Sequence, residues 1–337
     1  MLKIKAQNLK SLSHKNFSQV ELTFNSNDDL NILLGENSKN IDKLNEIIDV
    51  EITFFGNKLL IVGKKHNVEL AEELINKVYD ILLFNKNNVS SIDFSIFESE
   101  YNMLKNKNSV DTSSKVLNSI DTWNKTIYPK SDGQNKYIQA VNQYDVIFGL
   151  GPAGTGKSYL AVAKAVEFLK KGQIDKIILS RPAVEAGENL GFLPGDMKDK
   201  VDPYLRPIYD ALYEMMPFEI VEKKIQEGII EIAPVAFMRG RTFKNSFIII
   251  DEAQNTSSIQ MKMILTRLGH GSKMIINGDL TQIDIKYIND SGLSTAKKKL
   301  ANLKTIKFIN LNKKDVVRHK IVSQIISAYE KWFLFVK

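Results

Sequence analysis

The segment GPAGTGKS at residues 151–158 constrains the fold of this chain more than any other feature. It fits the pattern GxxxxGK[ST] and stands between an apolar strand-like run, VIFGL, and a helix-like segment, SYLAVAKAVEFLKK. Glycines in the loop permit backbone conformations that direct successive N–H groups into one concavity, and the following helix adds its positive end. The sequence therefore predicts a P-loop that binds a polyphosphate. Its residues are Gly151, Pro152, Ala153, Gly154, Thr155, Gly156, Lys157 and Ser158.

The last two loop residues carry the predicted chemistry. Lys157 is expected to reach the β- and γ-phosphates of ATP, and the hydroxyl of Ser158 is expected to ligate Mg²⁺. The alternative is a glycine-rich loop with an accidental Lys-Ser pair, and the strand, loop and helix context argues against it. ATP and Mg²⁺ are thus the expected ligands.

Carboxylates are expected at the ends of two further strands. In FIIIDEAQ, residues 247–254, Asp251 is expected to hold Mg²⁺ through its water shell, and Glu252 to orient and deprotonate the attacking water. In NGDLTQ, residues 277–282, Asp279 and Gln282 are expected to sense the γ-phosphate or position water, and the alternative is a polar turn. Because these groups suit water as the acceptor, and no feature identifies a second substrate, the sequence favours an ATPase over a kinase.

Beyond residue 133, short buried strands alternate with longer amphipathic segments. Continuous apolar runs joined by helix-length connections are typical of a parallel sheet that is covered on both faces. We therefore expect an α/β domain over residues 133–337. The predicted strands are VIFGLG (146–151), KIILS (176–180), IIEIAP (229–234), FIIID (247–251), KMIING (273–278) and TIKFIN (305–310).

Residues 1–84 are typical of a separate, smaller α/β domain. The pattern predicts strands at FSQVELTF (17–24) and LNILLG (30–35), a helix over KNIDKLNEIID, strands at VEITFF and KLLIVG, and a long helix with one apolar face. Residues 85–132 are rich in Asn, Ser, Lys and Asp, which indicates a linker. Its apolar islands FSIF and KTIYP suggest that parts of this linker dock on a neighbouring domain.

Composition limits the function classes. No run of about eighteen apolar residues predicts a membrane span, and the start MLKIKAQNLK lacks the apolar stretch of a signal peptide, so we expect a cytoplasmic protein with no membrane partner. With no Cys and four scattered His, any metal is expected to have oxygen ligands. The net charge of +7 suits a polyanion such as RNA, but a general surplus of Lys explains it equally well.

Several long segments resemble the PhoH family of bacterial ATPases. They are GQNKYIQAV, GLGPAGTGKSYLAVAKAV, SRPAVEAGENLGFLPGDMKDKVDPYLRPIYDAL, IEIAPVAFMRGRTF, FIIIDEAQNTSSIQMKMILTRLGHGSKMIINGD and DVVRH, and the resemblance covers residues 125 to about 330. It implies a single RecA-like P-loop NTPase core, of the kind found in superfamily 1 helicases. Two departures are small: Ser158 replaces the commoner Thr, and Asn277 stands where Thr is usual.

The resemblance also implies roles that spacing alone does not assign. Gln134 matches a position that contacts adenine, and Arg318 is similar to an arginine that approaches the γ-phosphate, either of its own subunit or across a subunit boundary. Arg239 and Arg241 compete for that role, and a structural salt bridge is the alternative for each arginine. Arg181 follows the second core strand, where helicase-like relatives place a nucleic-acid contact; otherwise its loop only shapes the rim of the ATP site.

The N-terminal domain looks like a KH module with a turn at GENS, residues 35–38. KH modules clamp a nucleic-acid backbone with a GXXG loop between helices, and Ser38 replaces the last glycine here. Lys39 and Lys43 follow the turn, and a solvated helix face explains them more simply than a phosphate contact.

The resemblance implies Mg²⁺-dependent ATP hydrolysis coupled to RNA metabolism, either ribosomal-RNA maturation beside an endoribonuclease or helicase-like remodelling. Because the chain has residues for only one RecA-like lobe, strand separation requires a second subunit, and we expect a ring-like homo-oligomer. The alternative is an ATP-controlled interaction module that regulates a partner ribonuclease. The sequence leaves the RNA target, helicase or nuclease activity, ring size and partner identity open.

Overall fold

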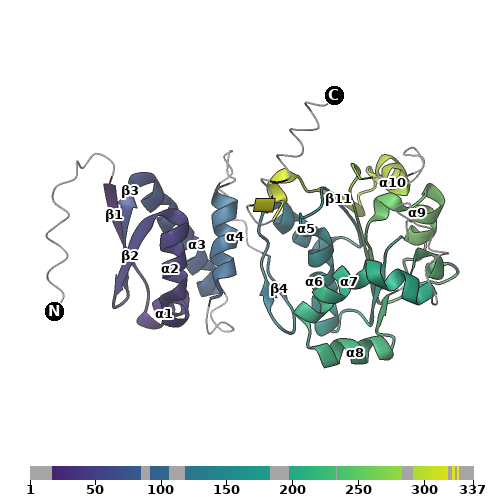
Figure 1. Ribbon diagram of the computed structural model, residues 1–337, viewed down its shortest axis with the longest axis horizontal. Coiled ribbons are helices and arrows are strands. Elements are labelled where there is room, and N and C mark those ends of the chain that lie inside the picture. Colours follow the sequence, from purple (N-terminus) through teal and green to yellow (C-terminus); the bar gives the residue numbers. More distant parts are fainter. Residues whose placement is uncertain are drawn as a thin grey trace. The chain divides into compact units, whose positions relative to one another are not determined.

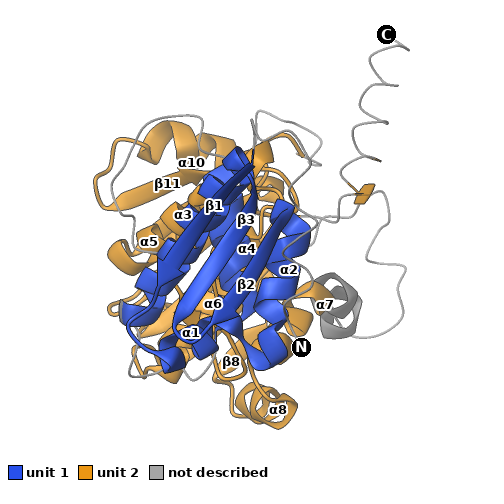
Figure 2. Cartoon of the chain, turned by 90° about the vertical axis from the view of Figure 1, so that its left-hand side faces the viewer, with its two compact units in different colours: residues 1–113 blue, residues 114–337 orange. Residues whose placement is uncertain are grey.

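The computed structural model describes residues 17–84, 92–105, 118–182, 197–232, 234–282 and 291–317, together with residues 321, 322 and 325. The chain forms two compact units, residues 1–113 and residues 114–337, which Figure 2 shows in two colours. No helix in the described ranges is long and apolar enough to cross a bilayer.

Unit 1 is a three-stranded antiparallel sheet with helices that pack on it. The sheet has the order β1-β3-β2, and its core includes Leu30, Leu33, Leu44, Leu59, Ile61 and Leu74, all of them buried. The elements are β1 (Phe17–Thr23), α1 (Asn27–Leu34), the short 3₁₀ helix η1 (Glu36–Ser38), α2 (Lys39–Ile48), β2 (Val50–Phe55), β3 (Lys58–Lys64), α3 (Lys65–Phe84) and α4 (Phe94–Lys105).

One predicted element of unit 1 is wrong: LNILLG belongs to helix α1 and is not a strand. The side chain of Ser26 caps this helix by accepting a hydrogen bond from the backbone N–H of Asp29 at 3.1 Å. Asp28 and Asp29 also lie in the first turn, where the helix dipole favours negative charge. Leu30, Leu33 and Leu34 then bury one helical face, and that spacing outweighs the short apolar run.

Helix α4 lies within the segment that composition assigns to a linker. It packs on α3, and the side chain of Asn40 donates hydrogen bonds at 3.0 Å to the backbone oxygens of Leu33 and Ile92. The apolar island FSIF supplies Phe94, Ile96 and Phe97 to the buried side of α4. Residues 92–105 therefore belong to unit 1.

Unit 2 contains a six-stranded parallel sheet with the order β11-β6-β10-β9-β7-β8. All six predicted strands are confirmed: β6 (Val146–Leu150), β7 (Lys176–Ser180), β8 (Ile230–Ile232), β9 (Ser246–Ile250), β10 (Lys273–Gly278) and β11 (Ile306–Asn310). Strand β10 lies between β6, which precedes the P-loop, and β9, which precedes Asp251. The predicted α/β core with a parallel sheet is thus confirmed.

Helices cover both faces of this sheet, as the continuous apolar strands predict. The helices are α5 (Asp132–Gln143), α6 (Lys157–Lys170), α7 (Met197–Met215), α8 (Phe218–Gln226), α9 (Ser258–Leu265) and α10 (Gly292–Leu300). Along β9, Phe247 and Ile249 pack with α5 to α8, whereas Ile248 and Ile250 pack with α9 and α10. Alternate residues of one strand therefore enter two separate cores.

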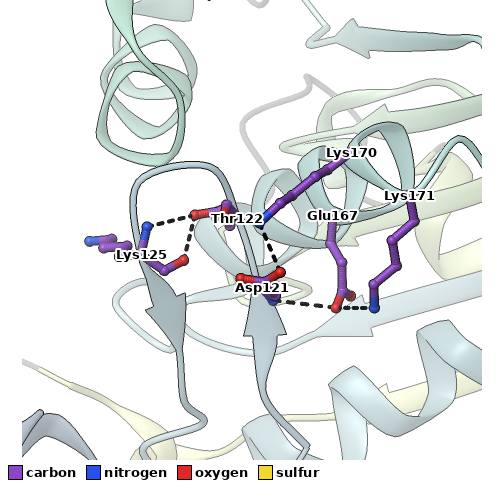
Figure 3. Close-up of polar contacts among 6 residues, drawn as sticks. All are labelled: Asp121, Thr122, Lys125, Glu167, Lys170 and Lys171. Atoms are coloured by element: carbon purple, nitrogen blue, oxygen red, sulfur yellow. Dashed lines mark hydrogen bonds and ion pairs between the residues drawn. The ribbon is translucent and has the colours of Figure 1, made fainter. Parts of the chain in front are cut away.

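A small hairpin, β4 (Ile120–Asp121) with β5 (Thr126–Ile127), docks on helix α6 and belongs to unit 2. Figure 3 shows the polar contacts. Lys170 Nζ donates to the carboxylate of Asp121 at 2.8 Å and to the backbone oxygen of Thr122 at 2.7 Å. The backbone N–H of Asp121 donates to Glu167 at 3.3 Å, and Glu167 also accepts from Lys171 at 2.8 Å. The predicted linker thus contributes structure to both units.

Candidate ATP and magnesium site

The P-loop joins β6 to α6 and needs glycine at defined positions. Gly151 has a φ of 152°, and a Cβ there would lie 2.5 Å from the backbone oxygen of Leu311. Gly156 has a φ of 81°, in the left-handed region, at the start of α6. The loop backbone therefore turns sharply between the strand and the helix N-terminus, as the motif predicts.

Lys157 lies over the loop from which it extends. Its Nζ donates hydrogen bonds to the backbone oxygens of Gly151 at 2.6 Å and Pro152 at 2.8 Å. Burial lowers the pKa of Lys157, and the carboxylates of Asp251, Asp279 and Glu252 oppose that shift. These carboxylates come from two different strand ends, so both predicted acidic segments act electrostatically on the P-loop lysine.

Ser158 and Asp251 meet directly. The hydroxyl of Ser158 donates to Asp251 Oδ1 at 2.6 Å, although 93 residues separate them along the chain. Asp251 is only 7% exposed, and burial raises the pKa of its carboxyl, an effect that the hydrogen bond from Ser158 opposes. A hydroxyl and a buried carboxylate beside the P-loop are the protein oxygens that Mg²⁺ takes together with substrate phosphates.

No cluster of three or more His, Asp or Glu side chains that would hold a metal by itself occurs among the described residues. A site that shares its metal with nucleotide phosphates needs no such cluster, because Mg²⁺ retains several waters and uses one or two protein ligands. The donor set of Ser158 and Asp251 fits this kind of site.

Glu252 is held in a defined orientation beside Asp251. It has a φ of 52°, a left-handed conformation that is uncommon for a residue other than glycine. Its carboxylate lies 3.3 Å from the guanidinium of Arg181 and accepts a hydrogen bond from Gln254 Nε2 at 2.6 Å. Arg181 follows β7 and Glu252 follows β9, so these two neighbouring strands bring the pair together.

Gln254 is a site residue that sequence reasoning missed. It is 1% exposed, and besides its bond to Glu252 its side-chain oxygen accepts from the backbone N–H of Asp279 at 3.0 Å. Gln254 therefore connects the acidic end of β9 to the end of β10. The only signal in the sequence is its place in the DEAQ run, and its second partner lies 25 residues away.

Three buried polar atoms at the carboxyl ends of the strands have no hydrogen-bond partner within the described residues: Ser180 Oγ, Asn277 Nδ2 and Asp279 Oδ2. A buried polar atom without a partner costs about 1–3 kcal/mol. Such atoms are accommodated most readily where a polar ligand or water reaches them. Asp279 is buried, whereas Gln282, three residues later, is exposed. The two residues that were expected to respond to the γ-phosphate therefore occupy different environments.

The side-chain amide of Gln134 binds the P-loop. Its Nε2 donates to the backbone oxygen of Thr155 at 3.0 Å, and its Oε1 accepts from the backbone N–H of Lys130 at 2.6 Å. Beside it, the hydroxyl of Tyr137 donates to Asn277 Oδ1 at 2.8 Å. Helix α5 thus fixes the loop from behind, and the adenine contact of Gln134 remains a prediction.

Known proteins resemble this chain over much of its length. A family model described as "PhoH-like protein" matches residues 126–330. The chain belongs to the PhoH family. It is 46% identical over 302 residues to a PhoH-like protein of Bacillus subtilis, covering 90% of this chain and 88% of that protein. A PhoH-like protein of Synechocystis is 54% identical over 202 residues, which is 60% of this chain and 62% of the relative. Among solved structures, the Pif1 helicase from Candida albicans matches at 16% identity and a TM-score of 0.31, over 58% of this chain and 42% of that one.

The PhoH family model begins in β5 and covers residues 126–330, which is most of unit 2. The alignment with the Bacillus relative spans 302 residues and therefore extends well into unit 1. Both units thus have counterparts in another PhoH-like protein.

The arginines expected near the γ-phosphate separate into different environments. Arg318 lies outside the described residues. Arg241 forms a two-pronged ion pair with Glu231, with Nη2 2.7 Å from Oε2, and its guanidinium lies 4.7 Å from the ring centre of Phe243. Arg241 therefore forms a structural salt bridge, which is the alternative to a γ-phosphate contact for this residue. Arg239 is exposed, just after the 3₁₀ helix η3 (Val235–Met238).

Proposed function

We propose that this PhoH-family protein is a cytoplasmic Mg²⁺-dependent ATPase that acts in RNA metabolism. The observation that carries the proposal is the hydrogen bond between Ser158 and Asp251 beside a P-loop whose Lys157 donates to the backbone oxygens of Gly151 and Pro152. This arrangement combines a phosphate cradle, a hydroxyl and carboxylate for Mg²⁺, and a second carboxylate for a water molecule.

In this mechanism Lys157 exchanges its bonds to loop oxygens for bonds to the β- and γ-phosphates of ATP. Ser158 and Asp251 would hold Mg²⁺, which neutralises charge on the phosphate oxygens when it is bound. Glu252 orients the attacking water and accepts its proton, and Gln254 keeps that carboxylate in position. Asp279 and Gln282 respond to the γ-phosphate.

The RNA part of the proposal is supported by the topology of unit 1. Its element order, strand, helix, helix, strand, strand and helix, with residues 35–38 between the two helices, fits a KH-like module. We propose that unit 1 contacts RNA, that Arg181 contributes from the core, and that a single lobe acts as a ring-like homo-oligomer beside an endoribonuclease of ribosomal-RNA maturation. In such a ring, Arg239 or Arg318 would reach a neighbouring subunit's ATP.

The test is ATP turnover of the purified chain with Mg²⁺ and with chelator, each with and without structured RNA. We expect Mg²⁺-dependent turnover that RNA raises several-fold and that high salt returns to the basal rate. If RNA has no effect and only a partner ribonuclease raises the rate, the chain is an ATP-controlled interaction module. Light scattering with and without ATP tests the ring, and a monodisperse monomer under both conditions contradicts it.

A further inference from the structure

The positive charge of this chain is concentrated in one segment. Residues 291–317 contain seven lysines and a single acidic residue, Asp315, so they contribute a net +6 of the chain's +7. Asp315 is only 4% exposed and accepts hydrogen bonds from Ser131 Oγ at 2.6 Å and the backbone N–H of Asn312 at 2.8 Å. The charge that this segment presents to solvent is therefore entirely positive.

These lysines follow one outer edge of the parallel sheet. Strand β11 is the edge strand, and the chain enters it directly from α10 (Figure 1). Leu300 at the end of α10 and Ile306 and Phe308 of β11 pack against the same apolar cluster. We call the seven residues the lysine edge: Lys297, Lys298 and Lys299 in the last turn of α10, Lys304 in the connection, Lys307 on β11, and Lys313 and Lys314 after β11. The lysine edge thus runs from the amino end of the sheet to its carboxyl end.

The central lysines of this edge have no ion-pair partner among the described residues. Lys298, Lys299, Lys304 and Lys307 are exposed, and none of them forms an ion pair within the described part of the chain. The lysines of α6 behave differently, because Lys170 and Lys171 pair with Asp121 and Glu167 at 2.8 Å. A general surplus of lysine does not explain four exposed lysines without an ion pair among the described residues, grouped within ten residues at the end of α10, in the connection and on β11.

We propose that the lysine edge is a binding surface for the phosphate backbone of RNA, an inference that rests on the RNA-linked function proposed above. Rows of lysine neutralise phosphates and release counterions, which gives affinity without base readout. The described segment 291–317 has no exposed aromatic side chain on which a base could stack. The surface therefore binds RNA without sequence preference.

The lysine edge ends beside the P-loop. Just after Lys314, the buried carboxylate of Asp315 accepts from the backbone N–H of Gly133 at 3.2 Å, and the backbone N–H of Val317 donates to the backbone oxygen of Gly154 at 3.0 Å. RNA bound along β11 thus contacts a segment that is hydrogen-bonded to the ATP-binding loop. This contact provides a direct route by which RNA alters ATP turnover.

The test compares two fourfold variants of the full chain with equal changes in charge. The first replaces Lys298, Lys299, Lys304 and Lys307 with Gln. The control replaces four exposed lysines of unit 2 outside the lysine edge with Gln: Lys176, Lys223, Lys244 and Lys262. Binding of a fluorescent single-stranded RNA of about 16 nucleotides is measured by anisotropy at several salt concentrations.

Each phosphate neutralised on single-stranded RNA contributes about 0.7 to the slope of log K against log salt, so the first variant should lower that slope by up to about 3. The control should keep the slope and affinity of the wild type, and both variants should keep the basal ATPase rate. If both variants lose affinity equally, or if neither does, the lysine edge is not the surface, although the RNA-linked function stands. If the wild type binds no RNA while it hydrolyses ATP, the RNA part of the proposed function fails as well.

Discussion

Replacing Glu252 with Gln tests the chemistry of the site most specifically. The substitution keeps the size of the side chain and an oxygen that can accept from Gln254, but it removes the carboxylate that would take the proton of water. A positioned general base contributes about 10²–10⁴-fold, which corresponds to about 3–5 kcal/mol in the activation free energy. We therefore expect steady-state ATP turnover to fall by that factor. ATP affinity should stay within about twofold of the wild type.

The same substitution should leave folding almost unchanged. The ion pair that it removes, between Glu252 and Arg181 at 3.3 Å, joins side chains that are 37% and 25% exposed, and such pairs contribute at most about 1 kcal/mol. Asp251→Asn is the matched control, because it should lower Mg²⁺-dependent ATP affinity instead. Turnover of Glu252→Gln at the wild-type rate would refute the assigned role.

Three further predictions concern the scaffold of the site, and denaturant unfolding measures each. Glu167→Gln leaves Lys164, which is 3% exposed, without its charged partner and should lower the free energy of unfolding by about 3–5 kcal/mol. Lys164→Met with Glu167→Leu should recover part of that loss, because it also removes the acceptor of Lys171 and of the Asp121 backbone N–H. Burial raises the pKa of Glu167, but hydrogen bonds from Lys164 and Lys171 outweigh burial and hold that pKa below its usual range. The wild type should therefore keep this stability above about pH 4.3 and lose it as the pH falls further, and the loss should be absent from Glu167→Gln. Tyr137→Phe removes the donor to Asn277 Oδ1 and should cost about 1–3 kcal/mol; unchanged stability would mean that this bond contributes nothing. Gly149→Ala would place a Cβ 2.4 Å from Asn277 Oδ1 and should cost about 1–3 kcal/mol or more, so a fully stable variant would contradict the close packing behind the P-loop.

The core sheet could be predicted from sequence because each strand is a continuous apolar run. Such runs are buried on both faces, and the helix-length connections between them require parallel pairing. The P-loop and the DEAQ segment were predicted as separate motifs, and the sheet order brings Ser158 and Asp251 to 2.6 Å. The motif pattern fixes these residues because the chemistry of phosphate and magnesium tolerates few alternatives.

The errors and omissions have physical causes. A run of five apolar or amide residues at 30–34 fits both a short strand and one face of a helix, and the cap at Ser26 decides for the helix. Gln254 could not be assigned, because its contact with Asp279 depends on which strands are neighbours in the sheet. The lysine edge was visible only as net charge until the exposure of its side chains and the position of β11 were known.

The account as a whole depends on Mg²⁺-dependent binding of ATP at the P-loop. Isothermal titration of ATP into the wild type and Lys157→Ala, with Mg²⁺ and with chelator, measures this most directly. We predict Mg²⁺-dependent binding by the wild type and a loss of about 10- to 100-fold in Lys157→Ala, since a hydrogen bond to a charged group contributes about 1.5–3 kcal/mol. Wild-type protein without Mg²⁺-dependent affinity, or Lys157→Ala with undiminished affinity, would contradict it.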